Sequence, residues 1–225
     1  MRYLIVCGGK IDKEFGLNEI KTDGIDAIIA ADSGMDFLYE NGVTPDIIVG
    51  DFDSATTNAL EYFERKGQTE IRRLNPIKDD TDTEYAIRLA ISEGARSIVV
   101  LGATGSRIDH VLGNISLLGI GLESGTDICI IDTNNRIRMA DKPVTIEKSA
   151  QYGRFVSLIA VTDDNEVSLK GFKYPVTDYS FDRFTSLGIS NEIVDDQAVV
   201  DIHRGKFIII ESKDLLFGSF GLLWF

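Results

Sequence analysis

Apolar and polar positions follow two different periods along the first part of the chain, up to about residue 135. Runs that are apolar at nearly every position predict strands covered on both faces, at residues 3–7, 27–31, 47–49, 97–101 and 128–131. Between them, apolar spacings of three and four predict helices at residues 35–40, 55–66, 83–93 and 111–122. Strands that alternate with helices predict an α/β fold with a doubly wound, mainly parallel sheet.

After about residue 135 the helical period gives way to short β-rich runs separated by Gly, Asp and Asn. These runs are residues 144–147, 155–161, 166–169, 198–202 and 207–211. Short strands at regular spacing favour an antiparallel β-sandwich or a small barrel. We therefore expect an α/β domain at 1–140, a C-terminal antiparallel β-sandwich domain at 141–217, and an apolar tail at 218–225. The tail is either a docking segment or an added remnant.

The chain is strongly acidic, with 36 acidic against 23 basic residues and a formal net charge of -13. Such a charge disfavours broad binding to nucleic acids or anionic membranes, and an anionic substrate would need metal ions and local cations.

No apolar run approaches the roughly 20 residues that span a bilayer. Cys7 and Cys129 lie in apolar runs, and residues 1–6 run directly into a strand, so we expect buried thiols and a cytoplasmic protein.

Two acidic segments, residues 50–54 and 78–82, carry most of the candidate chemistry. In the first, Asp51 and Asp53 flank Phe52, so in an extended backbone both carboxylates point to one side. They follow a predicted parallel strand, at the carboxyl edge where open α/β sheets bind ligands. The alternative is a plain strand-to-helix turn with Asp53 or Ser54 as its N-cap.

The second segment opens a predicted helix. Thr81 and Glu84 form a capping-box pattern, which places Asp82 in the first turn beside the positive end of the helix dipole. Carboxylates that gather at one edge repel one another unless a cation lies between them. Oxygen ligands without nearby His or Cys favour Mg²⁺, which usually accompanies phosphate. Phosphate chemistry is therefore the first hypothesis.

Glycine-containing loops follow two further strands. In residues 102–110 the glycines allow close approach of a ligand, the next helix offers N–H groups to a phosphate, and Arg107 is a two-pronged donor. The alternative is an ordinary turn with a solvated arginine, and His110 reads as a helix-start residue rather than a base. Asp32 and Ser33 end another strand, either as nucleotide contacts or as an N-cap.

Taken in order, these segments resemble the thiamine pyrophosphokinase (thiamine diphosphokinase) family, and the resemblance covers nearly the whole chain. The matching segments are residues 31–34, 45–46, 50–54, 79–82, 102–110, 171–175 and 188–192. Two positions depart from the family pattern: Ser106 stands where a second glycine is common, and Phe172 where leucine is common. Neither change removes a functional group.

The resemblance implies an α/β domain that binds ATP and Mg²⁺, followed by a β-sandwich domain, in a homodimer with thiamine at the subunit interface. The implied Mg²⁺ ligands are Asp51, Asp53 and Asp82. The implied nucleotide-binding residues are Asp32, Ser33, Gly34, Thr104, Gly105, Arg107, Asp109 and His110. The implied thiamine-binding residues are Tyr174, Ser190 and Asn191.

The implied reaction is transfer of pyrophosphate from ATP to the hydroxyl of thiamine, which gives thiamine diphosphate and AMP. Arg107 and Lys78 would add cationic donors, and Asp79 is the candidate for orienting or deprotonating the hydroxyl. The candidate catalytic residues are Asp51, Asp53, Asp79, Asp82 and Arg107. One rival is a Mg²⁺-dependent phosphohydrolase or nucleotidyl transferase with another acceptor. The other is a non-catalytic sensor that only binds a nucleotide.

Overall fold

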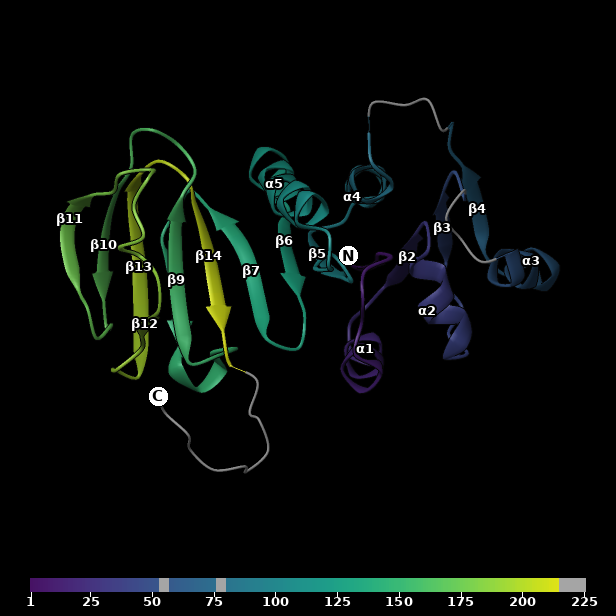
Figure 1. Cartoon of the computed structure of the whole chain (residues 1–225), viewed down its shortest axis with the longest axis horizontal. Coiled ribbons are helices and arrows are strands. Elements are labelled where there is room, and N and C mark those ends of the chain that lie inside the picture. The colour runs from purple at the N-terminus through teal and green to yellow at the C-terminus, as the bar shows by residue number, and fades with distance from the viewer. Residues whose placement is uncertain (53–56, 76–79, 215–225) are drawn as a thin grey trace.

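The computed structural model describes residues 1–52, 57–75 and 80–214 (Figure 1). Asp53, Lys78, Asp79 and the apolar tail at 218–225, all named above, lie outside these ranges. Of the helices within them, none combines the length and apolar character needed to cross a membrane.

The continuous apolar runs of the first half form the parallel part of the larger sheet. Its strand order from the outer edge is β4-β3-β2-β1-β5-β6, and each neighbouring pair is parallel. The strands are β1 (Arg2–Val6), β2 (Ala27–Ala31), β3 (Ile47–Gly50), β4 (Glu70–Arg73), β5 (Ser97–Leu101) and β6 (Asp127–Ile131). The ranges predicted for β2 and β5 are confirmed residue for residue.

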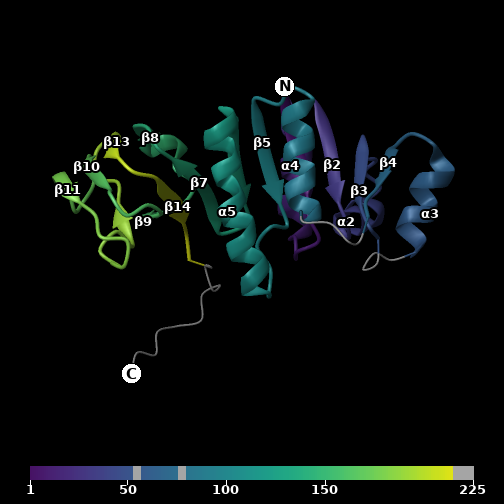
Figure 2. The ribbon, with the colours of Figure 1, turned by 90° about the horizontal axis from the view of Figure 1, so that it is seen from above.

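Helices cover both faces of this parallel part (Figures 1 and 2). They are α1 (Lys13–Ile20), α2 (Gly34–Glu40), α3 (Thr57–Lys66), α4 (Asp82–Ser92) and α5 (Ile108–Ser124). Leu89 of α4 and Leu118 of α5 join the apolar core on one face. Leu38 of α2 and Phe63 of α3 join the core on the other face, where α1 also packs. The predicted doubly wound α/β arrangement is confirmed.

Side chains in the sequence fix the ends of these helices. The Thr81 hydroxyl accepts the Glu84 N–H at 3.2 Å, as the capping-box pattern predicts, and α4 begins directly after it. The Asp12 carboxylate accepts the Phe15 N–H at 2.9 Å at the start of α1. Gly125 ends α5 with φ of 71°, a left-handed conformation that glycine adopts without strain.

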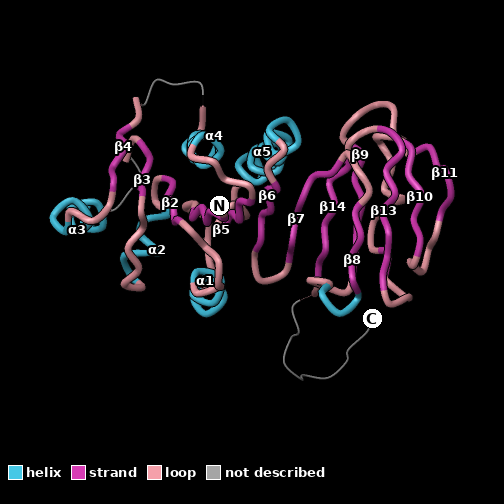
Figure 3. The backbone as a smooth tube through the Cα atoms, turned by 180° about the vertical axis from the view of Figure 1, so that it is seen from behind, coloured by secondary structure: helices cyan, strands magenta, loops and turns pink. Residues whose placement is uncertain are grey.

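The second half of the chain forms two antiparallel layers (Figure 3). Among the described residues the larger sheet has ten strands in the order β12-β9-β14-β7-β6-β5-β1-β2-β3-β4, and the smaller has four in the order β11-β10-β13-β8. The additional strands are β7 (Asn135–Ala140), β8 (Val144–Glu147), β9 (Phe155–Ala160), β10 (Glu166–Lys170), β11 (Val176–Ser180), β12 (Asn191–Glu192), β13 (Gln197–Arg204) and β14 (Phe207–Ser212). A short 3-10 helix spans Lys148–Ala150. The layers enclose an apolar core in which the Phe181 and Phe207 rings meet edge to face, so the predicted sandwich is confirmed.

One layer of the sandwich is continuous with the parallel sheet. Strand β7 pairs antiparallel with β6, with Ile137 opposite Ile130. The change of pattern near residue 135 therefore marks a change from parallel to antiparallel pairing within one sheet. The expected domain limits at residues 140 and 217 stay predictions.

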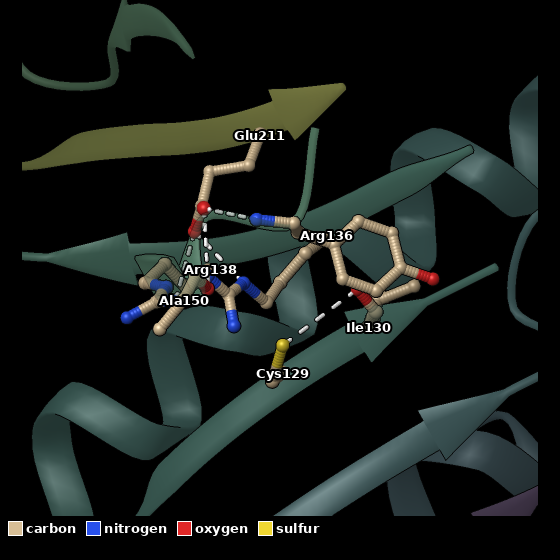
Figure 4. A network of polar contacts seen from close by, with 7 residues as sticks. Cys129, Ile130, Arg136, Arg138, Ala150 and Glu211 are labelled. Carbon is tan, nitrogen blue, oxygen red and sulfur yellow. Dashed lines mark hydrogen bonds and ion pairs between the residues drawn. The ribbon is translucent and has the colours of Figure 1, made fainter. Parts of the chain in front are cut away.

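A buried carboxylate joins the antiparallel strands (Figure 4). Glu211 of β14 has an exposed side-chain fraction of 0% and forms ion pairs with Arg136 at 2.6 Å and Arg138 at 3.0 Å, both from β7. It also accepts the Tyr152 N–H at 2.9 Å. The arginines satisfy a charge that would otherwise be costly to bury.

Several elements have no clear sequence signal. Strand β4 is an edge strand with the charged sequence EIRR, and β7 carries two arginines, so neither forms an apolar run. Helix α1 contains Gly16, where a Cβ atom would lie 2.6 Å from atoms of both Ile11 and Phe37. The glycine lowers helix propensity but allows close packing, which a propensity argument does not detect.

Candidate active site

A cavity of about 470 Å³ opens at the carboxyl edge of the parallel strands. It lies where the chain order diverges, with β2 following β1 on one side and β5 adjoining it on the other. Loops after β1, β2, β3 and β5 line it together with the first turns of α4 and α5. Open α/β sheets bind ligands at this kind of crossover point.

Three carboxylates from different elements meet in this cavity. Asp32 follows β2, Asp51 follows β3, and Asp82 lies in the first turn of α4. One oxygen from each lies within 4.8 Å of the others, and all three residues are partly buried. The structure thus brings together Asp51 and Asp82, as expected from the sequence, and adds Asp32, which the sequence associated with the nucleotide.

Backbone geometry fixes two of these acidic turns. Asp32 has φ of 48° and Phe52, directly after Asp51, has φ of 65°. Aspartate tolerates this left-handed region, but a bulky residue such as phenylalanine adopts it at a cost of about 1–3 kcal/mol. The Phe52 ring packs under the Arg73 guanidinium, 5.3 Å from its centroid. Strained backbone held by surrounding contacts is typical of functional sites.

The carboxylate cluster suits a divalent cation with hard oxygen ligands. Oxygen ligands of one Mg²⁺, each about 2.1 Å from the ion, lie about 3–4 Å apart, so the 4.8 Å limit is within reach of small side-chain movements. Three negative charges at this spacing repel one another, and a cation between them removes that repulsion. Asp53, the other expected ligand, lies outside the described residues.

Arg107 supplies positive charge at the cavity. Among the described residues that line the cavity, it has the only permanently charged cationic side chain. It is exposed and forms an ion pair of 2.6 Å with Asp109, whose pKa falls to about 2 because the guanidinium donates a hydrogen bond to the carboxylate. Asp109 therefore stays ionised and fixes the orientation of the Arg107 guanidinium.

The loop after β5 packs closely against the loop after β1. Gly102 has φ of 68°, and its carbonyl accepts the Gly9 N–H at 2.9 Å. A Cβ atom at Gly9 would lie only 2.3 Å from that carbonyl oxygen, so the approach requires glycine. The Asn114 amide of α5 donates to the Ala103 carbonyl at 2.8 Å. The backbone at this edge is therefore well fixed.

Of the remaining residues expected to bind the nucleotide, some line the cavity and others have a structural role. Ser33, Gly105 and His110 line the cavity. Gly34 begins α2, where a Cβ atom would lie 1.9 Å from the Val6 carbonyl oxygen, so it allows close packing of helix on strand. The Thr104 hydroxyl donates to the Asp132 carboxylate at 2.7 Å.

Sequence reasoning missed several residues that line the cavity. Asn114 lines the cavity and is the one amide side chain in the largely apolar helix α5. A polar residue within an apolar segment is the sequence signal that could have identified it. Cys7 ends the first apolar run, and nothing in its sequence context predicted that it lines the cavity. Its thiol accepts a hydrogen bond from the Thr83 hydroxyl at 3.4 Å, and burial raises its pKa to about 11.

A second cavity, of about 190 Å³, lies in the sandwich and has a mainly apolar lining that includes Leu169, Val176, Phe181, Leu187 and Ile189. The expected thiamine residues Tyr174 and Asn191 also line it. In both Figures 1 and 2, β10 and β11 lie at the far end of the molecule from β1, β2 and β3. The two cavities are therefore well separated within one chain.

The Asn191 side chain forms two hydrogen bonds with the backbone of Tyr174. Its side-chain oxygen accepts the Tyr174 N–H at 3.0 Å, and its amide donates to the Tyr174 carbonyl at 2.9 Å. Tyr174 itself is 62% exposed, with the Lys173 ammonium 5.5 Å from its ring centroid. Ser190 has φ of 60°, and its N–H donates to the Ser157 hydroxyl at 3.0 Å. The two Asn191 hydrogen bonds present the tyrosine ring at the rim of the second cavity.

Comparisons with known proteins agree on one family. Family models match in two parts, "Thiamin pyrophosphokinase, catalytic domain" at residues 21–130 and "Thiamin pyrophosphokinase, vitamin B1 binding domain" at residues 143–207. Thiamine pyrophosphokinase of Bacillus subtilis (strain 168) is 34% identical over 188 residues, which are 83% of this chain and 87% of that protein.

Solved structures give the same result. The crystal structure of thiamine pyrophosphokinase from Bacillus subtilis matches with a TM-score of 0.85 at 31% identity, over 96% of this chain and 100% of that chain. Thiamin pyrophosphokinase from Candida albicans, at 21% identity, shares the fold with a TM-score of 0.78 over 94% of this chain and 88% of that chain.

Proposed function

The chain belongs to the thiamine pyrophosphokinase family, and on that premise we propose that it transfers the pyrophosphoryl group of ATP to the hydroxyl of thiamine and releases AMP. The observation that carries this proposal is the approach of Asp32, Asp51 and Asp82 within 4.8 Å at the edge of the sheet. The net negative charge of the chain repels a polyphosphate, so the site needs a divalent cation, bound by these carboxylates, to receive it.

Mg²⁺, held by Asp32, Asp51 and Asp82 together with Asp53, would neutralise the charge that develops on the phosphate oxygens. Arg107, which lines the same cavity, binds the polyphosphate, and Asp109 orients its guanidinium through their ion pair. The N–H groups at the start of α5 and the close backbone around Gly105 complete the phosphate cradle.

Positioning and electrostatics supply most of the rate acceleration in this type of transfer, since no covalent enzyme intermediate is needed. The thiamine hydroxyl attacks the β-phosphorus, and the bond from that phosphorus to the bridging oxygen of AMP breaks. Asp79 is assigned the task of orienting the hydroxyl or accepting its proton.

Thiamine is assigned to the second cavity, between Tyr174 and the apolar side chains around Leu187. The cationic ring of thiamine suits a tyrosine face, a contact worth about 0.5–2 kcal/mol. Asn191 fixes the tyrosine loop through its hydrogen bonds to the Tyr174 backbone, and Ser190 is assigned to thiamine binding as the family resemblance implies. The elements that line the two cavities lie far apart within one chain, so we assign completion of the ATP cavity to the second cavity of another copy. We therefore assign the chain to a homodimer with shared sites.

The two family models at 21–130 and 143–207 support the expected division into an α/β domain at 1–140 and a sandwich domain at 141–217. Both cysteines, Cys7 and Cys129, are free thiols. Free thiols suit a reducing compartment, so we assign the protein to the cytoplasm.

The reaction class is tested by incubating the protein with ATP, Mg²⁺ and thiamine and measuring AMP and thiamine diphosphate separately. We expect equal amounts of both products and no AMP when thiamine is omitted. Nucleotide consumption without thiamine would indicate a phosphohydrolase. Saturable nucleotide binding without AMP would indicate a sensor. Either result contradicts the proposal.

A further inference from the structure

The Asp132 carboxylate lies at the centre of a hydrogen-bond network in the turn between β6 and β7. One oxygen accepts the N–H groups of Asn134 at 2.7 Å and Asn135 at 2.8 Å. The Asn135 side-chain amide donates to both oxygens, at 3.0 and 3.1 Å. The other oxygen accepts the Thr104 hydroxyl at 2.7 Å. Asp132 therefore joins its own turn to the loop that follows β5.

Thr104 occupies a particular place in that loop. Gly102, Ala103, Gly105, Ser106 and Arg107 all line the large cavity, whereas Thr104 is not among the described residues that do so. Its hydroxyl donates instead to Asp132. The threonine thus fixes the middle of the loop from behind, while the residues around it present backbone and guanidinium groups to the cavity.

The same turn is also tied to the sandwich. The Tyr152 hydroxyl donates to the Asp132 carbonyl oxygen, and the Tyr152 N–H donates to Glu211. The Arg136 guanidinium, which pairs with Glu211 in Figure 4, lies 5.6 Å from the centroid of the Tyr152 ring. Asp132 is held on two sides, so its carboxylate is a rigid support rather than a freely moving surface group.

We infer that Asp132 is a positioning residue for nucleotide binding, acting through Thr104 to hold the loop at residues 102–107 in the conformation that receives phosphate. Thr104 is then an anchor of the loop rather than the nucleotide contact that the family resemblance implies. The inference rests on the proposed function in placing the nucleotide in the large cavity.

The physical basis is preorganisation. A hydrogen bond to a charged acceptor is stronger than one between neutral groups, and here it restrains a loop rich in glycine. Without it the loop samples more conformations, and the nucleotide must order the loop on binding, which weakens affinity. The thiamine cavity lies elsewhere, so thiamine binding does not depend on this bond.

The test compares four variants by calorimetric titration with ATP and Mg²⁺, by steady-state kinetics and by thermal unfolding. Thr104→Val keeps the shape of the side chain but removes its hydroxyl, and Thr104→Ser is the matched control that keeps the hydroxyl. Asp132→Asn retains one oxygen for the N–H groups of the turn but faces Thr104 with an amide N–H, so a neutral hydrogen bond to the hydroxyl replaces the stronger one to a carboxylate. The fourth variant combines Thr104→Val with Asp132→Asn.

We expect Thr104→Val and Asp132→Asn each to weaken ATP binding roughly five- to twentyfold. The KM for thiamine should stay unchanged, and Thr104→Ser should behave like the wild type. The double variant should bind ATP no more weakly than Thr104→Val alone, because both changes act on the same interaction.

Normal ATP affinity in Asp132→Asn together with weak binding in Thr104→Val would overturn the inference, since Thr104 would then contact the nucleotide directly. Multiplied losses in the double variant, or an equal rise in the KM for thiamine, would overturn it as well. If the wild type binds ATP but transfers nothing to thiamine, the proposed function fails while the binding comparison still decides the role of Asp132. A wild type that binds no ATP would refute both.

Discussion

An oxygen of Asp51, which follows β3, lies within 4.8 Å of an oxygen of Asp82, in the first turn of α4, and an oxygen of Asp32 lies within the same limit of both. Like charges this close oppose folding when no cation is present. The positive end of the α4 dipole offsets part of the repulsion at Asp82. We therefore expect a cation bound among these carboxylates to stabilise the fold, and this leads to a first test.

Asp51→Asn should abolish activity and also stabilise the metal-free protein. We expect turnover to fall at least about a hundredfold, because the variant loses one of the carboxylates that we propose to hold Mg²⁺. The melting temperature without metal should rise, since one repelling charge is gone, and adding Mg²⁺ should raise it less than in the wild type. Asp127→Asn, at an exposed position of β6, is the matched control and should change neither quantity. Normal turnover in Asp51→Asn would exclude the carboxylate cluster from catalysis.

The thiol of Cys7 should be unreactive in the folded protein despite lying at the large cavity. Burial raises its pKa from 9.0 to about 11, and burial likewise raises the pKa of Cys129 to about 11. Alkylation at pH 8, followed by mass spectrometry, should leave both thiols intact unless the protein is first unfolded. An added surface thiol, Ser186→Cys, is the control and should react quickly.

The raised pKa of Cys7 also sets a direction for stability against pH. Because the folded value lies above the unfolded one, the contribution of the buried thiol is fully present below pH 9 and is lost as the pH rises through about 11. Replacing Cys7 with serine should flatten the loss of stability over that interval in urea unfolding. An equally steep loss in the variant would assign the effect to other groups.

Mixed dimers should regain activity from two inactive variants. Asp51→Asn disables the large cavity, and Leu187→Arg places a positive charge where the cationic thiamine ring is assigned. In a mixed dimer one site combines the intact large cavity of one chain with the intact second cavity of its partner. Differently tagged chains, purified as mixed dimers, should therefore show about half of the wild-type rate. Mixed dimers as inactive as their parents would indicate that each site lies within one chain.

Loss of the buried charge at Glu211 should destabilise the protein without affecting the chemistry directly. Glu211→Gln leaves Arg136 and Arg138 without their carboxylate partner and should lower the free energy of unfolding by about 3 kcal/mol. Glu166→Gln breaks the more exposed pair with Arg204 and should cost less than about 1 kcal/mol. Urea unfolding of both variants measures the difference. Equal losses would contradict the burial argument.

The sequence predicted the elements whose signal is local. Strands β2 and β5 are continuously apolar because helices cover both of their faces, and α4 follows directly from the Thr81 cap. The charged edge strand β4 and the arginine-bearing β7 gave no such signal. Their placement depends on partners elsewhere in the chain, such as Glu211 for β7. Long-range pairing of this kind leaves no periodic trace in one segment.

The site shows the same division. The meeting of Asp51 and Asp82 follows from the rule that loops at the carboxyl edge converge, so sequence position was enough to expect it. The inclusion of Asp32 depends on its left-handed backbone, and the turning of Thr104 toward Asp132 depends on a turn that follows another strand. Neither feature is encoded by nearby residues.

The ladder between β6 and β7 has a consequence for motion. Because Ile130 and Ile137 belong to one unbroken sheet, the two halves of a chain have no hinge about which to rotate as rigid bodies. Any closing over bound substrates must therefore come from the loops at the cavity rim or, in the proposed homodimer, from movement of one subunit relative to the other. The continuous sheet therefore keeps the cavity of the α/β part and the cavity of the sandwich at a constant separation within one chain.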